Sequence, residues 1–532
     1  MGRILGLKST DSGIYLLLSL FIVVVFGPIC ALIAITILYC TGNAADAIAL
    51  LLPAGRRLDL LISSVILAGT VAVSATGIGI LAGSLLWEIR TGVLSRLRWL
   101  VVVLVMVPAF LYAQAWITLF AWLHVPGSLP AGLISYWVQL GAFLPLGVVL
   151  GILAMASVDP VSIEAARIIY PDIRVFWRII LPIASPALGA SVGLIFLLSI
   201  TDYSVPSLFS LNVYALEIFS EFSASSEPAR ALLIAVPLLA VTMAVLFLAQ
   251  GRMRNLMMGT SLFQYQAEPP VYPRWFVALQ HAALGLLLLH SLVLVSVLVL
   301  QVAAMPEPVQ PILEAGSDIV TTFMIALVAA LCSLPLAYSV AARMSQPDRR
   351  GRIWWFLCIV QLALPAPLVG IGLIAVWNHP TISGFYGTLA MPVLAAMARF
   401  TPIAALIILV QLRHCDPLLT DAARVFQRSR IESWIRIRLP LLAPGLLAAA
   451  CVTFALSAGE LGATLLVIPP GMETVTIRIY NYLHYGSSGT VAGLGLVMMA
   501  LMLLVGGIAI AVVRGWVRLM WGRPARRGGD LS

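Results

Sequence analysis

Two short stretches of the sequence carry the same charged pattern, an acidic residue followed by two alanines and an arginine. The first is Glu164-Ala165-Ala166-Arg167 and the second is Asp421-Ala422-Ala423-Arg424. Small alanines beside an acid suit a short helix that another protein can approach closely, since the acid is favourable near the positive N-terminal end of a helix. The pattern therefore predicts docking of a partner and no bond-breaking chemistry.

Both stretches lie inside a longer internal repeat. Asp-Pro precedes each stretch, and Leu181-Pro182 and Leu439-Pro440 follow them. Further on, a shared Phe-x-Leu-Ser-x-x-acid pattern places Asp202 and Glu460 at matching positions. The offset is 257 residues before the arginine-rich loop and 258 after it, and chance would not hold such a register. The sequence therefore consists of two copies of one fold unit.

The composition places these copies in a lipid bilayer. The chain has 532 residues, of which 61% are hydrophobic and only 10% charged. Apolar runs of about 20 residues, enough to cross a hydrocarbon core of ~30 Å, recur along the whole length. They predict twelve spans, at residues 14–39, 60–87, 100–122, 134–157, 184–206, 232–250, 275–303, 319–342, 354–377, 389–412, 442–468 and 491–513.

The spans divide into two sets of six. We expect a first repeat over 1–250 with a charged loop at about 158–184, a cytoplasmic linker over 251–274, and a second repeat over 275–532 with a charged loop at about 413–442. An even number of spans makes the copies parallel. Most arginines fall in loops on one side, which predicts a cytoplasmic N-terminus and C-terminus and leaves four arginines outside, at Arg56, Arg57, Arg230 and Arg478.

The acid-Ala-Ala-Arg pattern followed by Leu-Pro-x-x-x-Pro resembles the EAA loop of binding-protein-dependent ABC importer permeases, and the similarity covers both halves. The resemblance implies an all-α integral membrane protein with the type I ABC importer permease fold, in the bacterial inner membrane. It also implies that the loops form coupling helices that dock on two cytoplasmic ABC ATPase subunits, and that a periplasmic solute-binding protein delivers the solute. The coupling residues would be Glu164, Ala165, Ala166, Arg167, Leu181, Pro182, Asp421, Ala422, Ala423, Arg424, Leu439 and Pro440.

One departure from the family pattern concerns the sixth residue after the acid. The family usually has glycine there, whereas this chain has Tyr170 and Gln427. Asymmetric engagement of the ATPases by the two loops is therefore an open alternative.

The sequence carries no sign of its own catalytic site. Its only lysine is Lys8, so it has no phosphate-binding P-loop, and we expect ATP to be used by partner subunits with no cofactor held by this chain. Histidines do not cluster, and the six cysteines lack metal-ligand spacing and are expected to be small buried residues, so no metal site is predicted. The positive charge lies in short loops, which argues against nucleic acid as a partner.

Acidic residues inside spans are candidates for a translocation path. Asp202, Tyr203 and Glu460 are the candidates here. Each acid follows a proline, Pro186 or Pro444, by 16 residues, which places it about 24 Å from the cytoplasmic face, near the outer mouth. The competing interpretation is that the acids lie at the wet end of a helix or bond a neighbouring helix. Arg399 could likewise pair with an acid on another helix.

The residues around these acids resemble the ferric-iron branch of the fused permeases, with thiamine, polyamine, phosphonate, sulfate and molybdate permeases as relatives. Ferric iron is the first expectation for the solute, moved by alternating access. Twelve spans in two parallel halves are also typical of a proton-coupled secondary transporter, which would need no ATPase. A carrier of that class would place ionisable residues at the midplane, whereas the acids here cluster in loops.

Overall fold

The computed structural model describes residues 12–89, 93–125, 129–259, 268–306, 310–379, 383–415, 434–485 and 488–521. All regular elements within these ranges are helices. Ten of them are long and apolar enough to cross a membrane, and two bent helix pairs bring the number to twelve in the described part of the chain. The all-α membrane fold expected from the sequence is therefore confirmed.

The elements of the first half follow one another as short and long helices, with a cluster of short ones after the fourth span. In order they are α1 (Ser12–Phe21), η1 (Ile22–Phe26), α2 (Gly27–Gly42), α3 (Ala44–Leu51), α4 (Arg56–Glu88), α5 (Val93–Leu104), α6 (Ala109–Trp122), α7 (Ala131–Ala156), α8 (Pro160–Arg167), α9 (Asp172–Val175), η2 (Phe176–Ile180), α10 (Leu181–Thr201), α11 (Ser204–Leu208), α12 (Tyr214–Ser225) and α13 (Pro228–Gly259).

The second half repeats this order. Its elements are α14 (Arg274–Ala303), α15 (Gln310–Glu314), α16 (Gly316–Met344), α17 (Arg349–Val360), η3 (Gln361–Ala363), α18 (Ala366–Trp377), α19 (Ser383–Tyr386), α20 (Ala390–His414), η4 (Trp434–Arg438), α23 (Leu439–Ala458), α24 (Thr464–Val467), α25 (Val475–Tyr485) and α26 (Ser488–Trp521). The domain boundaries themselves stay a prediction.

The third and ninth spans differ from the expectation of single straight helices. Helices Arg96–Leu104 and Ala109–Trp122 meet at 94°, and Arg349–Ala363 and Ala366–Trp377 meet at 103°. Each break lies at a proline, Pro108 or Pro365, because a proline has no N–H to donate and disfavours the helical conformation of the residue before it. The predicted spans 184–206 and 442–468 are also too long, since their helices end at Thr201 and Ala458.

Helices α4 and α7 cross at unusually close range, and glycines make the approach possible. Gly79 and Gly83 of α4 face Gly147 and Gly151 of α7, and a Cβ atom added at Gly147 would lie 2.3 Å from the carbonyl oxygen of Ala75. Such small-xxx-small pairs let helix backbones touch in a membrane, where lipid tails remove the hydrophobic drive for association.

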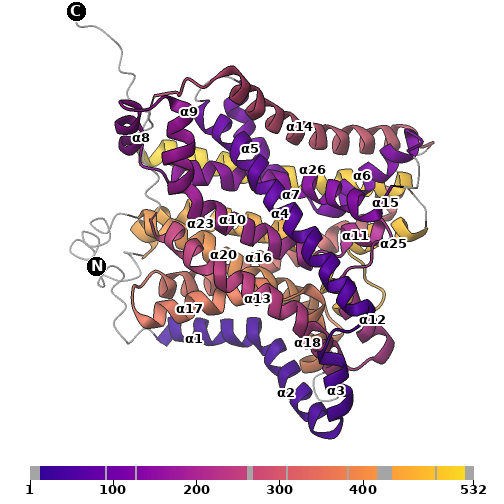
Figure 1. Ribbon diagram of the computed structural model, residues 1–532. Helices are drawn as coiled ribbons and strands as arrows, with labels where there is room; N and C mark the ends of the chain where they lie inside the picture. Colours follow the sequence, from indigo (N-terminus) through magenta and orange to yellow (C-terminus); the bar gives the residue numbers. More distant parts are fainter. Residues whose placement is uncertain are drawn as a thin grey trace, which may run out of the picture.

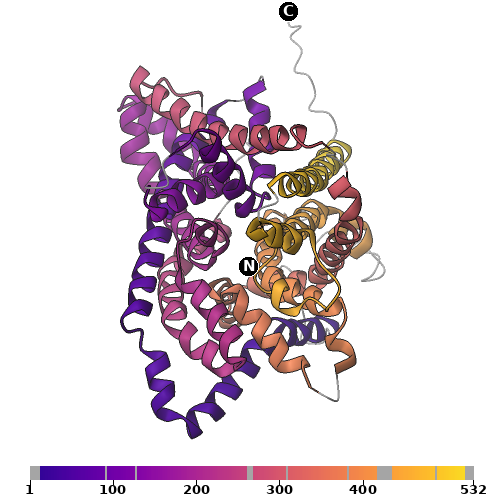
Figure 2. The ribbon, with the colours of Figure 1, turned by 90° about the vertical axis from the view of Figure 1, so that its right-hand side faces the viewer.

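The first span of each half packs against the other half. Helices α1 and α2 contact α16 and α18, and α14 contacts α4 and α6 as well as α26. Figure 1 shows α14 along one edge of the bundle and α1 along the opposite edge, and the turned view in Figure 2 again places the indigo N-terminal helices beside orange helices of the second half. In each half, the first span therefore packs against helices of the other half.

The six cysteines are all free, and their burial corrects one expectation. Cys358 and Cys451 are buried as expected, but Cys30 and Cys332 are exposed on the outer faces of α2 and α16. A thiol on a lipid-facing helix surface is already in apolar surroundings. Hydropathy alone therefore did not distinguish buried cysteines from lipid-facing ones.

Candidate functional site

Helix α8 carries the first acid-Ala-Ala-Arg motif and begins at a well-formed cap. Asp159 Oδ1 accepts a hydrogen bond of 3.0 Å from the backbone N–H of Val161, and Pro160 occupies the first helical turn. Both features favour helix initiation, because the cap satisfies a free N–H and proline tolerates this position. Ile163 is buried and holds the helix against the bundle.

One face of α8 and its C-terminal extension exposes apolar side chains outside the candidate spans. Val161 is 65%, Ile168 87% and Ile169 73% exposed, and Ala165 between them is also exposed. The spacing i, i+4, i+7 and i+8 places the four residues, called the α8 stripe below, on one side of a helix. Exposed apolar patches of this kind mark interaction sites.

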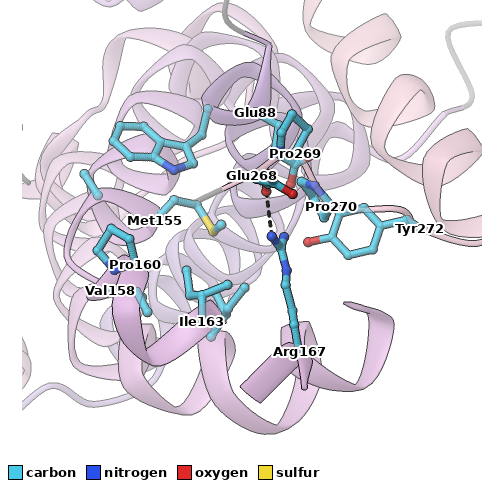
Figure 3. Close-up of a pocket in the computed structure, with 13 residues that line it drawn as sticks. Glu88, Met155, Val158, Pro160, Ile163, Arg167, Glu268, Pro269, Pro270 and Tyr272 are labelled. Atoms are coloured by element: carbon cyan, nitrogen blue, oxygen red, sulfur yellow. Dashed lines mark hydrogen bonds between the residues drawn. The ribbon is translucent and has the colours of Figure 1, made fainter. Parts of the chain in front are cut away.

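Arg167 points away from the α8 stripe and into the protein. Its Nε lies 2.9 Å from Asp172 Oδ1, and its Nη1 donates a 2.6 Å hydrogen bond to the carbonyl oxygen of Glu268. The side chains of Arg167 and Asp172 are only 19% and 16% exposed. Figure 3 shows Arg167 reaching across to Glu268 beside Tyr272. The motif thus divides its residues, with Ala165 on the surface and Arg167 inside.

The second copy of the motif, Asp421 to Arg424, lies outside the described residues. Leu439 and Pro440 are described and begin α23 after the π-helical turn η4, just as Leu181 and Pro182 begin α10 after the π-helical turn η2. Helices α10 and α23 thus begin in the same way, with Leu-Pro directly after a π-helical turn.

Asp202 ends α10 and caps the next short helix, α11. Its Oδ1 accepts hydrogen bonds from the N–H and the hydroxyl of Ser204, at 3.0 and 2.6 Å. Its Oδ2 accepts a 3.1 Å bond from Gln139 on α7, and Gln139 in turn accepts one from Ser199 at 2.8 Å. The acid therefore bonds a neighbouring helix, as the competing interpretation supposed.

Glu460 has the matching place in the second half but a charged partner. Its side chain is fully buried and pairs with Arg399 of α20 at 2.5 Å, as the sequence suggested for that arginine. Glu460 also accepts hydrogen bonds from the N–H groups of Ala463 and Thr464, at 2.9 and 2.7 Å, and so caps α24. A polar residue two or four positions after each acid was the signal for this capping role.

Tyr203 and the turn after Glu460 meet across the two halves. A Cβ atom added at Gly462 would lie 2.6 Å from Ala366 and 3.4 Å from the ring of Tyr203. Tyr203 is buried and stacks at 6.4 Å on Phe219. The structure thus brings Tyr203 and the turn that follows Glu460 to one interface between halves, while contact of the candidate path residues with solute stays a prediction.

The described part of the chain contains no group of three or more His, Cys, Asp or Glu side chains placed to hold a metal ion. The carboxylates of Asp202 and Glu460 are themselves used in hydrogen bonds to the next short helix and, for Glu460, in an ion pair.

Comparison with known proteins identifies the kind of molecule. Residues 333–518 match the family model described as "Binding-protein-dependent transport system inner membrane component". The Fe(3+)-transport system permease protein FbpB 2 of Haemophilus influenzae is 22% identical over 496 residues, which cover 87% of this chain and 92% of that protein.

Two further relatives match smaller parts of the chain. A putative 2-aminoethylphosphonate transport system permease protein of Salmonella typhimurium is 30% identical over 145 residues, 27% of this chain and 53% of that protein. A probable molybdenum ABC transporter permease protein of Haloferax volcanii is 28% identical over 211 residues, 38% of this chain and 74% of that protein. The second half of the chain thus carries the domain of the binding-protein-dependent inner membrane transport components, and the first half has the same helix order, as in a fused two-half permease.

Proposed function

We propose that this chain is the membrane-spanning subunit of an ATP-driven importer for ferric iron. A solute-binding protein delivers the iron on the outer side, two ABC ATPase subunits bind on the cytoplasmic side, and the chain carries the iron across by alternating access. The family match and the relative aligned over most of both chains support this function.

The α8 stripe is the observation that supports an ATPase as the partner. Val161, Ile168 and Ile169 expose apolar side chains beyond the candidate spans, where no lipid tails would cover them. A second protein that covers the stripe would remove this surface from water, at roughly 25 cal/mol per Å². A groove on an ATPase is the occupant that fits a short helix with a small residue, Ala165, at the centre of its exposed face.

Helix α10 gives the docking event a route to the interface between halves. It begins at Leu181 beside the α8 loop and ends at Thr201, directly before Asp202 and Tyr203. Its 21 residues span about 30 Å at 1.5 Å per residue. A displacement of the loop by closing ATPases would therefore move the Tyr203 turn against Gly462.

Ferric iron is the solute that the relative with the longest alignment among those compared above supports. The phosphonate and molybdenum relatives match shorter parts, and thiamine, polyamine and sulfate stay alternatives. The binding protein performs most of the selection in such systems, so uptake must be measured with each solute. Cells that express the full system should take up radioactive iron, and preferred uptake of 2-aminoethylphosphonate or molybdate would reassign the substrate.

The partner is tested by co-purification of the tagged chain with candidate ATPases. We expect Ile168→Glu to abolish co-elution, because it places a charge in the α8 stripe. Ser162→Glu adds the same charge to the same helix near its N-terminus, off the stripe, and should keep co-elution. Iron transport by the purified chain alone, driven by a proton gradient, would replace the importer with a secondary transporter.

A further inference from the structure

The six residues that precede α14 form an extended segment against the first charged loop. The segment is Glu268-Pro269-Pro270-Val271-Tyr272-Pro273, called the strap below. It belongs to the sequence between the two halves and continues directly into α14, the first span of the second half. Together with Arg167 and Glu88 it lines a small cavity beside α8 (Figure 3).

Two polar contacts fasten the strap to the loop. Arg167 donates to the carbonyl oxygen of Glu268, and the N–H of Val271 donates to Asp172 Oδ2. The ion pair between Arg167 and Asp172 joins the two contacts, so that strap and loop close a ring of interactions. Hydrogen bonds to charged groups contribute more than neutral ones, and this ring uses two.

Aromatic packing fastens the same place from the other side. The ring of Phe176, in η2, lies 4.9 Å from Phe276 and 6.1 Å from Tyr272, and Tyr272 lies 4.8 Å from Phe276. Phe276, in the first turn of α14, is fully buried among residues of the first half. Burial and the carboxylate of Glu88 raise the pKa of the Tyr272 hydroxyl, which keeps it neutral.

The composition of the strap lowers the entropy lost on docking. Three of its six residues are prolines, whose φ angle is fixed before docking. Proline lowers the conformational entropy of a free chain, so an extended proline-rich segment binds at smaller entropic cost than a flexible one.

We infer that the strap is a docked part of the first coupling loop and that Arg167 is a positioning residue that holds it there. The first loop is thereby tied to α14, which packs against α4 and α6 of the first half and α26 of the second. A force on α8 reaches α14 through the strap. It also reaches α10 through η2. The docking stands on the contacts alone, whereas its role in coupling rests on the proposed function.

Hydrogen exchange of the full chain in nanodiscs tests the docking. In the strap only Glu268, Val271 and Tyr272 have a backbone N–H, since positions 269, 270 and 273 are prolines. We expect slow exchange at Val271 in the wild type and exchange about tenfold faster in Asp172→Ala, as for loss of a hydrogen bond to a charged acceptor. Arg167→Ala should accelerate it too, and Arg167→Lys should restore part of the protection.

Arg174→Ala is the matched control, because it removes an exposed arginine from the same loop without a contact to the strap. Its exchange should equal that of the wild type. Fast exchange at Val271 in the wild type, or equal exchange in wild type and Asp172→Ala, overturns the inference. Size-exclusion profiles identify variants that misfold. The exchange rate of Val271 in the wild type tests the docking without any variant.

Coupling is measured on the chain reconstituted with its ATPases. Arg167→Ala should lower the solute transported per ATP hydrolysed, and Arg167→Lys should restore part of this ratio. An unchanged ratio removes the coupling role. Slow exchange at Val271 without any ATPase binding would support the docked strap and overturn the proposed function. ATPase binding with fast exchange at Val271 would support the proposed function and overturn the docked strap.

Discussion

At the scale of single residues, the two halves solve one problem with different chemistry. Asp202 and Glu460 both end a span and cap the short helix that follows. Asp202 is held by the neutral Gln139, whereas Glu460 is paired with the guanidinium of Arg399. Only Glu460 therefore neutralises a positive charge inside the protein.

This difference predicts unequal costs for matched substitutions. Glu460→Gln leaves Arg399, whose side chain is 24% exposed, without its anion, and breaking such a buried pair costs about 3 kcal/mol. Asp202→Asn retains an acceptor for Ser204 and should cost about 1 kcal/mol. Thermal unfolding in detergent should thus show a clearly larger fall in Tm for Glu460→Gln, and equal falls would show that the ion pair contributes nothing.

At the scale of elements, the α4–α7 crossing depends on bare glycine backbones. Gly147 packs on the carbonyl of Ala75, whereas Gly77, on α4 itself, has open space around its Cα. Gly147→Ala should cost about 1–3 kcal/mol or more, since the backbones must separate. Gly77→Ala should be neutral or slightly stabilising, because alanine favours a helix. Yield and Tm of the two purified variants measure the contrast, and a tolerated Gly147→Ala would mean that the helices can shift apart.

The sequence predicted that the spans exist better than it predicted where they break. Hydropathy located the spans because each needs about 20 apolar residues. Prolines did not predict the bends, since Pro145, Pro186 and Pro402 lie inside continuous helices while Pro108 and Pro365 interrupt theirs. Packing of neighbouring helices decides whether a proline breaks a span, and one sequence does not contain that information in readable form.

The candidate site shows the same limit. The repeat predicted the α8 motif and the matching positions of Asp202 and Glu460 from local patterns. It did not predict the inward turn of Arg167, because its partner Glu268 lies 101 residues away in the sequence. Gln139 was missed for the same reason, as an uncharged residue on a different span from Asp202.

At the scale of the whole molecule, the charges are divided between the two ends of the helices. Figure 1 shows α8 at one end and α12 and α25 at the other. Three of the four arginines expected outside are neutralised by acids, as Arg56 by Glu217, Arg230 by Asp46 and Glu221, and Arg478 by Asp318. Few arginines lie at the α12 and α25 end, whereas the sequence predicts most arginines in loops on the α8 side, and this bias favours a cytoplasmic position for the α8 end.

Cysteine labelling tests this orientation. In a variant without the six native cysteines, Ala224→Cys marks the exposed C-terminal end of α12 and Ile169→Cys marks the end of α8. A membrane-impermeant maleimide on intact spheroplasts should label Cys only in the α12 variant, and opened membranes should allow both. Cells without the partner ATPases prevent protection of the α8 stripe by a bound subunit. Labelling of the α8 variant alone in intact spheroplasts would invert the orientation and with it the side on which an ATPase could dock.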